Sequence, residues 1–426
     1  MSEQYCAEKE LELYFHIPFC VKKCLYCDFL SAPGDERTMR AYMKALLAET
    51  AGSASRYAEC YITSIFIGGG TPSVVPMECV EELLAAVMSH YNLAEDAEIT
   101  MEVNPGTISE EGLLRLRKAG VNRLSIGLQS AHNEELAAIG RIHTWEEFEV
   151  SFAAARAAGF DNINVDLMSA LPGQTISVYR DSLRKVLSLN RPPEHISAYS
   201  LIVEEGTPFY EKCEKGELDI PDEDTDRVMY RETKAILARE GYRRYEISNY
   251  AKKGYECRHN CGYWRRKNYI GFGIGAASLL ENVRFRNGSQ LNAYLANPLG
   301  CREEIQKLSI QEQMEEFFFL GLRMTEGTDC GEFETLFGRR PEEVYGAVIR
   351  KNIRDGLLRY RMGTERTAGR SDSMLRDSGD RAGKADNAGT GGADSGSGKV
   401  SGCAVCLALT DRGMDVSNYV MAQFLL

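Results

Sequence analysis

Three cysteines lie close together near the start of the sequence, within the stretch YFHIPFCVKKCLYCDF (14–29). Cys20, Cys24 and Cys27 are separated by three and then by two residues. A structural zinc site needs four ligands, so these three do not complete one locally. Three thiolates can instead bind three irons of a [4Fe–4S] cluster and leave the fourth iron open to a small molecule. The alternative is that the cysteines are core residues or bind zinc with His16 as fourth ligand.

Further residues able to bind a ligand follow the predicted strands in order. A GGGTP segment (68–72) comes after the second strand, and glycines let a backbone approach a ligand closely, although any tight turn also uses them. Glu102 ends the third strand, Gln129 ends the fourth, Arg141 follows twelve residues later, and Asp166 lies in the fifth. A buried polar side chain costs several kcal/mol unless it finds a partner. Four in one series indicate a shared polar site rather than four separate core groups.

Short apolar runs typical of strands alternate with helical patterns over roughly the first half of the chain. Near-continuous apolar runs are expected for parallel strands covered on both faces. Because the polar residues lie at the C-terminal ends of successive strands, we predict an α/β fold, a partial (β/α)6 TIM-like barrel. The predicted strands span 13–18, 64–70, 98–103, 123–128, 162–168 and 195–201, and helices are predicted at 38–51, 78–91 and 109–120, with a capping box at Thr144–Glu147 opening another.

The pattern changes after about residue 240. Amphipathic patterns at 311–324 and 341–358 predict a small, mainly helical, winged-helix-like C-terminal domain. The glycine-rich segment 363–402 has no aromatic residue, so we predict a disordered insertion that interrupts this domain. We therefore divide the chain into three parts: a barrel with the cluster site at 1–240, a sheet extension and linker at 241–300, and the C-terminal domain at 301–426.

Composition narrows the function class. The net charge of −12 argues against nucleic acid as the main partner, because neutralising phosphates needs a basic surface. The 13 cysteines are odd in number and spread over 426 residues, unlike a disulfide scaffold. Neither a signal-peptide pattern nor an apolar run long enough to span a bilayer is visible, so we expect a cytoplasmic protein.

The motifs together resemble the radical S-adenosylmethionine (SAM) family. In that family CxxxCxxC lies in the loop after the first strand of a partial barrel, and the amino and carboxylate groups of SAM bind the open iron. The segments that match, in order, the branch typified by coproporphyrinogen dehydrogenase are YFHIPFC, GGGTP, GLQS, DLMSALPGQT and LTDRG…SNYV. The match runs from about Tyr14 to about Leu280 and is looser beyond.

The resemblance implies which residues contact cofactors. The open iron of the cluster on the three cysteines would bind SAM, and Tyr14, Gly69 and Glu102 would contact that molecule. In the dehydrogenase a neighbouring region holds a second SAM. The residues that would line that region here are Tyr26, Gly70, Thr71, Gln129, Arg141 and Asp166.

Two departures distinguish this chain from the dehydrogenase. That enzyme has a longer segment before the cluster motif and a fourth cysteine two residues after the third. Here the motif begins at Cys20 and Phe29 takes the fourth position. Both departures resemble the HemW branch of haem chaperones, which bind haem and pass it to acceptor proteins. We therefore expect haem as a further cofactor and haem-accepting proteins, respiratory or membrane-associated ones among them, as partners of a monomer or dimer. Radical oxidative decarboxylation of coproporphyrinogen III is the alternative, so whether the protein is an enzyme stays open.

The segment HNCGYW (259–264) has the form HNxxYW found in the haem-chaperone branch. His259 is a candidate axial ligand of haem iron. The alternative is that the motif only caps a loop and packs. Cys257 and Cys261 flank the histidine and are weaker candidates, because reduced cysteines are usually structural.

Short basic groups lie near this motif, at Arg243–Arg244 and in the RRK segment (265–267). Such groups are normally solvated surface. Beside a porphyrin they could pair with propionates, because the arginine fork suits carboxylates.

Overall fold

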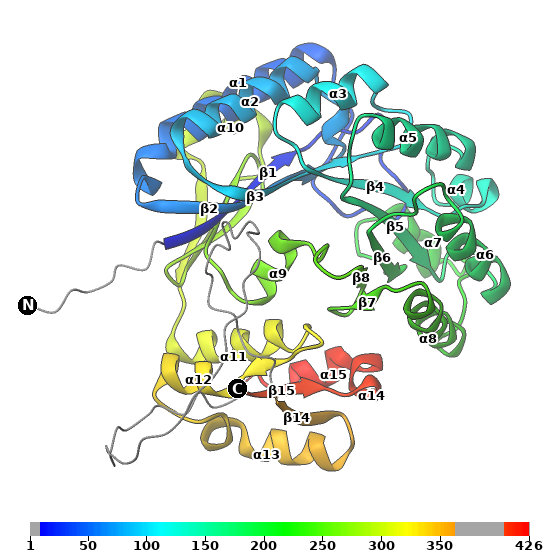
Figure 1. The fold of residues 1–426 in the computed structure, drawn as a ribbon. Helices are drawn as coiled ribbons and strands as arrows, with labels where there is room; N and C mark the ends of the chain where they lie inside the picture. Colours follow the sequence, from blue (N-terminus) through cyan, green and yellow to red (C-terminus); the bar gives the residue numbers. More distant parts are fainter. Residues whose placement is uncertain (1–8, 363–403, 426) are drawn as a thin grey trace, which may run out of the picture.

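The computed structural model describes residues 9–362 and 404–425, so the predicted insertion at 363–402 lies outside the described residues. A six-stranded parallel sheet forms the first part of the chain (Figure 1). Each of its strands pairs in parallel with the next along the chain. The strands are β1 (Lys9–Ile17), β2 (Cys60–Gly69), β3 (Asn92–Val103), β4 (Arg123–Gln129), β5 (Ile163–Ser169) and β6 (His195–Ser200).

Helices cover the outer, convex face of this curved sheet (Figure 1). They are α1 (Glu36–Ser53), α2 (Met77–His90), α3 (Glu110–Lys118), α5 (Trp145–Ala157), α6 (Ile176–Leu187) and α8 (Glu223–Arg239). The predicted capping box begins α5, where Thr144 and Glu147 exchange side-chain and backbone hydrogen bonds. Every residue of β4 is buried, as expected for a parallel strand with both faces covered. The predicted partial (β/α)6 barrel is confirmed.

Six further strands extend the sheet at both edges, to twelve in all among the described residues. A short hairpin, β7 (Arg243–Arg244) and β8 (Asn249–Ala251), pairs with β6. At the other edge β9 (Tyr269–Phe272) lies parallel to β1. The antiparallel strands β10 (Ala277–Leu280), β11 (Val283–Asn287) and β12 (Arg302–Lys307) follow it. Because β12 pairs with β11, the sheet continues past residue 300, where the sequence placed the start of the C-terminal domain.

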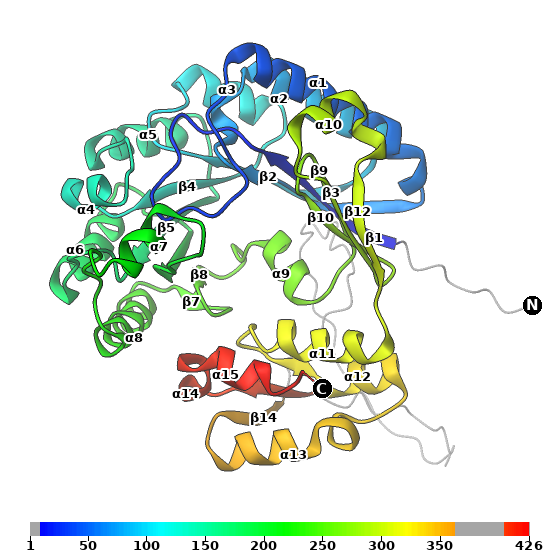
Figure 2. The same ribbon diagram turned by 180° about the vertical axis from the view of Figure 1, so that it is seen from behind.

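Shorter elements connect these layers. They are α4 (Asn133–Ala138), α7 (Pro208–Glu214), α9 (Arg258–Trp264), α10 (Leu291–Ala296) and three 3-10 turns, Ala54–Tyr57, Pro72–Val74 and Pro298–Gly300. Seen from both sides, α9 lies on the concave side of the sheet, between the barrel and the C-terminal domain (Figures 1 and 2). The family-like HNCGYW segment therefore forms an internal helix.

The C-terminal domain has its own apolar core, which includes Phe318, Phe333, Tyr345 and Phe424. Its small sheet has the strand order β13-β15-β14, made by Thr328–Asp329, Val405–Leu409 and Leu358–Met362. Its helices are α11 (Ile310–Gly321), α12 (Cys330–Phe337), α13 (Pro341–Arg354), α14 (Asp411–Asp415) and α15 (Ser417–Ala422). This mixture of helices and a three-stranded antiparallel sheet agrees with the predicted domain.

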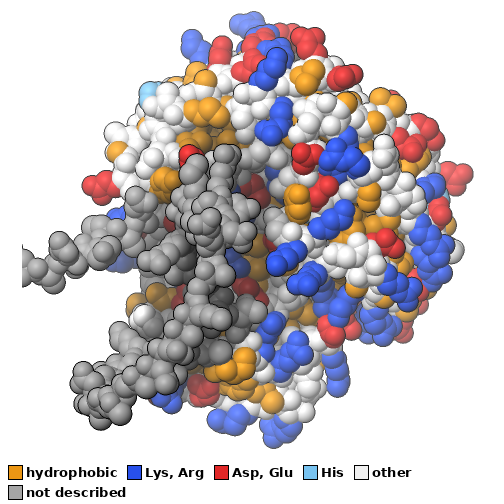
Figure 3. All heavy atoms as spheres, viewed as in Figure 1, with side chains coloured by type: hydrophobic (Ala, Val, Ile, Leu, Met, Phe, Trp, Pro, Cys, Tyr) orange, Lys and Arg blue, Asp and Glu red, His pale blue; other side chains and the backbone are white. Residues whose placement is uncertain are grey.

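Charged side chains of both signs cover the face seen in Figure 3, and many Lys and Arg side chains lie on its right-hand side. No helix among the described residues has both the length and the apolar character needed to cross a bilayer.

Candidate cofactor site at the ends of the barrel strands

The three cysteines lie on the loop that follows β1. Hydrogen bonds between Cys20 N–H and the Ala32 carbonyl (3.2 Å), and between Ala32 N–H and the Pro18 carbonyl (3.0 Å), close the base of this loop. Cys20, Cys24 and Cys27 all line one cavity of about 320 Å³. The closed loop therefore presents the three thiols to a common space at the C-terminal end of the parallel strands.

Polar donors contact two of the sulfur atoms. Arg141 Nη1 donates to Cys24 Sγ at 3.6 Å, and Thr71 Oγ1 donates to Cys20 Sγ at 3.5 Å. Burial raises the pKa of the Cys27 thiol. Hydrogen bonds to sulfur stabilise the thiolates that bind iron and tune a cluster's potential.

These thiols suit a cluster better than one ion. In the described part of the chain, no three His, Cys, Asp or Glu side chains are grouped to hold a single metal ion. A [4Fe–4S] cluster does not need three side chains that converge on one ion, since each thiolate binds a different iron. His16 is not placed as a fourth ligand. Its Nδ1 lies 3.0 Å from the Tyr14 hydroxyl and its Nε2 lies 2.8 Å from the Leu30 carbonyl, so it supports the loop.

The glycine segment after β2 lets its backbone pass next to the cysteine loop. Gly69 has φ of +113°, a region that favours glycine, and its N–H donates to Glu102 Oε2 at 3.0 Å. A Cβ on Gly70 would lie 2.5 Å from the Phe19 carbonyl oxygen and 3.0 Å from Cys20 Sγ. A larger residue at Gly70 would therefore push the cysteine loop away.

Two carboxyl groups line the cavity, that of Glu102 on β3 and that of Asp166 on β5. Burial, and then the nearby Asp166, raises the pKa of Glu102 to about 8. Burial also raises the pKa of Asp166, although Asn164 and Ser197 donate hydrogen bonds that oppose the shift. Arg123 lowers the pKa of both acids, and Arg141 lowers that of Asp166, but by less than burial raises them, so a ligand carrying positive charge would be favoured between them.

Gln129 and Arg141 complete the polar wall. Gln129 has φ of +73°, uncommon for a residue with a side chain, and accepts a hydrogen bond from the Tyr199 hydroxyl at 2.9 Å. Arg141 donates to Asn104 Oδ1 at 2.9 Å and to the Gly127 carbonyl. A strained backbone held in place by its surroundings is a feature of ligand sites.

The structure brings nearly all the predicted residues together. Besides the three cysteines, the predicted residues that line the cavity are Tyr26, Gly69, Gly70, Thr71, Glu102, Gln129, Arg141 and Asp166. Tyr14 is not among the residues that line it. Its contact with SAM stays a prediction.

Sequence reasoning missed other residues of the wall. Asn104 lies two residues after Glu102 in the strand-end segment EVNP, so its position carried a signal that we did not use. Ser125 lies on β4 just before the GLQS motif, and Ser197 and Tyr199 come from β6, for which the sequence analysis singled out no motif. Ser248 and Asn249 were also missed, and they belong to the β7–β8 hairpin region. The other lining residues outside the prediction are Lys22, Lys23, Phe29, Val103 and Gly127.

His259 does not lie in this cavity. It is 1% exposed, its Nδ1 is 2.8 Å from Ser64 Oγ, and its Nε2 is 2.9 Å from the Tyr263 hydroxyl. Burial, and then Arg123, lowers its pKa to about 3. Both ring nitrogens are already hydrogen-bonded inside the protein, so in this conformation His259 is an interior structural residue and not an available haem ligand.

The basic groups near α9 are also engaged. Arg266 pairs with Glu316 at 2.9 Å, and Lys267 pairs with Glu10 at 2.6 Å. Arg244 reaches Asp411 at 3.3 Å. These groups neutralise carboxylates of the protein itself, which argues against the predicted pairing with haem propionates.

Comparison with known proteins identifies the family and the fold. Residues 14–186 match the model of the radical SAM superfamily, and residues 308–362 match the HemN C-terminal domain. A solved structure of coproporphyrinogen III oxidase (HemN) from Escherichia coli, 20% identical, superposes with a TM-score of 0.77 over 98% of this chain and 90% of its own. At that identity the likeness shows the fold.

Two relatives with higher sequence identity show the family as well as the fold. The "Heme chaperone HemW" of Lactococcus lactis is 38% identical over 352 residues, which are 82% of this chain and 91% of that protein. The protein of the same name from Escherichia coli K12 is 38% identical over 356 residues, again 82% and 91%. The chain therefore belongs to the HemW family of heme chaperones, within the radical SAM superfamily.

Proposed function

We propose that the protein is a haem chaperone that carries a [4Fe–4S] cluster with SAM on its open iron, binds haem and transfers it to acceptor proteins. The observation that carries the cofactor part is the single cavity lined by the three cysteines, the glycine segment and the polar strand ends. Family membership carries the haem part.

Cys20, Cys24 and Cys27 would hold the cluster, and Arg141 and Thr71 would steady it through their contacts with sulfur. When bound, the cluster supplies redox chemistry and the open iron supplies a site for SAM. The chain's own part is binding and positioning. An ammonium group fits beside Glu102, because a positive charge offsets the cost of ionising that buried carboxyl.

Apolar side chains at the rim of the cavity support haem binding there. Val21, Phe29 and Ile142 are 60%, 59% and 54% exposed. Phe29 lines the cavity, and the other two line a small adjoining hollow together with Cys24. Haem is a flat, largely apolar ring, so such exposed side chains offer it contact area. Lys22 is exposed on the same loop and suits a propionate.

The proposal is tested on protein purified and reconstituted without oxygen. Four irons and four sulfides per chain, and a shift of the Soret band on titration with haem, are expected. Phe29→Ser should weaken haem binding several-fold, because it removes an exposed ring at the rim. Ile305→Ser is the matched control: Ile305 is 68% exposed, but it lies on β12, the edge strand of the sheet.

Two results would overturn the proposal. The first is the absence of a Soret shift in cluster-loaded protein. The second is conversion of coproporphyrinogen III to protoporphyrinogen by the protein with SAM and a reductant under argon, which would favour the dehydrogenase. Transfer is tested by mixing the haem-loaded protein with a haem-free cytochrome and following the spectrum of the acceptor.

A further inference from the structure

A chain of buried hydrogen bonds joins the wall of the cofactor cavity to the C-terminal domain. It begins at Asp166, whose Oδ1 accepts a hydrogen bond from Asn164 Nδ2 at 2.7 Å. Asn164 Oδ1 lies 2.6 Å from His195 Nδ1, and His195 Nε2 lies 2.8 Å from the Tyr245 hydroxyl. His195 is fully buried and Asn164 is 2% exposed, so water does not compete for these contacts.

The direction of each hydrogen bond follows from its partners. Asn164 Nδ2 donates to Asp166 Oδ1 and to Ser125 Oγ (2.8 Å), and Asn164 Oδ1 accepts from Ser197 Oγ at 3.1 Å. These partners together place the amide oxygen toward His195. His195 Nδ1 must then carry the proton, because a carbonyl oxygen only accepts. Burial, and then Arg123, lowers the pKa of His195 well below its usual value, so the ring is neutral and Nε2 accepts from the Tyr245 hydroxyl. Every group therefore donates toward Asp166, an arrangement in which hydrogen bonds strengthen one another.

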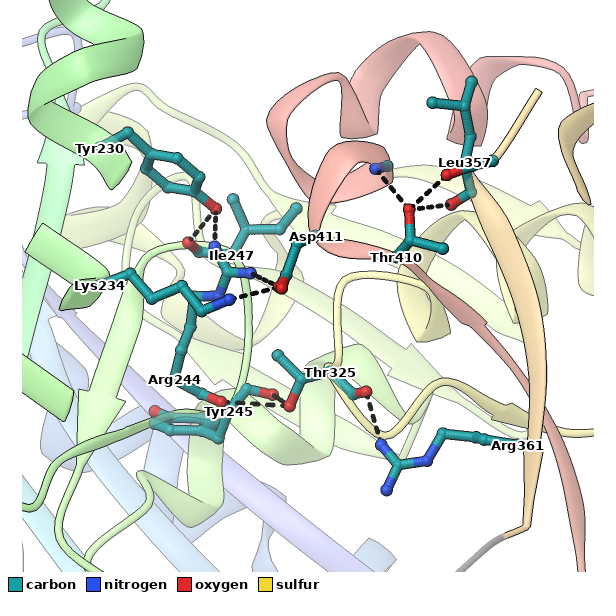
Figure 4. Close-up of polar contacts among 12 residues, drawn as sticks. Tyr230, Lys234, Arg244, Tyr245, Ile247, Thr325, Leu357, Arg361, Thr410 and Asp411 are labelled. Carbon is teal, nitrogen blue, oxygen red and sulfur yellow. Dashed lines mark hydrogen bonds and ion pairs between the residues drawn. The ribbon is translucent and has the colours of Figure 1, made fainter. Parts of the chain in front are cut away.

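Tyr245 is the point where this chain meets two other parts of the molecule. Its hydroxyl accepts a hydrogen bond from the N–H of Cys257, the residue before α9, at 3.3 Å. Its carbonyl accepts from Thr325 N–H at 2.9 Å and from Thr325 Oγ1 at 3.2 Å. Thr325 lies between α11 and β13 of the C-terminal domain, and Arg361 of β14 donates to its carbonyl at 3.0 Å (Figure 4).

An ion-pair cluster fixes the same junction. Asp411, at the start of α14, receives Lys234 of α8 at 2.5 Å and Arg244 of β7 at 3.3 Å (Figure 4). Arg244 is the residue before Tyr245, and its guanidinium also donates to the Tyr230 hydroxyl at 2.8 Å. The C-terminal domain is therefore attached to the short strand β7, and the residue after this strand, Tyr245, is the end of the buried chain opposite Asp166.

We propose that Tyr245 and His195 are positioning residues for Asp166, and that through them the docking of the C-terminal domain sets the geometry of the cofactor cavity. The inference rests on the proposed function only in taking SAM as the ligand of the cavity. A domain that engages an acceptor protein could in this way alter how firmly the cavity holds its ligand.

The test measures SAM affinity of anaerobically reconstituted protein by equilibrium dialysis. Tyr245→Phe removes the buried hydroxyl that bonds His195 and accepts from Cys257 N–H, and it should weaken SAM binding about fivefold. Asn164→Ala interrupts the same chain, so the double variant should lose about as much as the more affected single variant. The control is Tyr179→Phe, which removes a buried hydroxyl that bonds Thr233 at 2.8 Å between α6 and α8, and should leave the affinity unchanged.

A SAM affinity of Tyr245→Phe within twofold of the wild type, or a double-variant loss equal to the product of the single losses, would overturn the inference. A second measurement needs no ligand. Nitrogen NMR of ¹⁵N-labelled histidines should show the His195 proton on Nδ1. The His195 signal is assigned by its loss in His195→Gln. A proton on Nε2 would reverse the direction of the hydrogen bonds and refute the inference. If the wild type binds no SAM, the proposed function fails. The His195 tautomer still decides whether the buried hydrogen bonds run toward Asp166.

Discussion

Replacing Glu102 with glutamine should make the ligand-free protein more stable, and increasingly so as the pH rises. The pKa of Glu102 is raised from its ordinary value of 4.5 to about 8, mainly by burial. A folded-state pKa above the unfolded one means that the native protein binds more protons than the unfolded chain. The stabilising effect of the protonated form is therefore complete below pH 4.5 and is lost as the pH rises toward 8.

The magnitude follows from the shift. One pKa unit corresponds to about 1.4 kcal/mol, so the wild type should lose on the order of 3 kcal/mol between pH 5 and pH 7.5 through this carboxyl alone. Glutamine is neutral throughout and keeps an oxygen that can accept from Gly69 N–H, the partner of Glu102 at 3.0 Å. The two proteins should have similar free energies of unfolding at pH 5, and Glu102→Gln should exceed the wild type by about 3 kcal/mol at pH 7.5.

The assay is urea unfolding of cluster-free protein in reducing buffer at several pH values, followed by circular dichroism. Glu81→Gln serves as a control of opposite sign. The hydrogen bond to Arg115 lowers the pKa of Glu81, so this variant should be less stable than the wild type at neutral pH by under about 1 kcal/mol. A difference between Glu102→Gln and the wild type that does not change with pH would refute the reasoning. It would mean that Glu102 ionises as in water and that the cavity is open to solvent.

Three further outcomes are expected. Gly70→Ala should leave less than half of the wild-type iron after reconstitution, because its Cβ would lie 3.0 Å from Cys20 Sγ; full iron content would contradict this. His259→Gln should lower the melting temperature by about 2 °C or more and leave haem affinity unchanged, because the ring makes two buried hydrogen bonds. Loss of haem binding at an unchanged melting temperature would instead identify His259 as the haem ligand. Glu49→Ala should cost about 3 kcal/mol or more in urea unfolding, because the 5%-exposed carboxylate accepts three hydrogen bonds that join α1 to the sheet extension; a loss under 1 kcal/mol would contradict it.

The barrel could be predicted from the sequence because its signals are local. Near-continuous apolar runs marked six strands, and a strand end places a polar residue at a known edge of a parallel sheet. Glu102, Gln129 and Asp166 followed from that rule, and all three line the cavity. The capping box at Thr144–Glu147 depends on four consecutive residues and was equally accessible.

The parts that could not be predicted depend on long-range contacts. The hydrogen bond between Ser64 and His259 joins residues 195 positions apart, and only the folded chain shows that it occupies one ring nitrogen of the residue expected to bind haem. The hairpin strands β7 and β8 have two and three residues, too few for any periodicity. Tyr245 and His195 each look like an ordinary aromatic of a β-segment, because their roles are set by their partners rather than by spacing.

The pairing of β9 with β1 has a consequence for the order of events during synthesis. The strand that leads into the cysteine loop has β2 on one side and Tyr269–Phe272 on the other. Until the ribosome has made that segment, β1 is an open edge with unpaired backbone groups. Domains fold as units once their chain is available, so the cysteine loop gains its final support only when well over half of the polypeptide exists. Cluster loading is therefore expected to follow translation, and a chain truncated before β9 should acquire iron poorly even though it contains every cysteine of the motif.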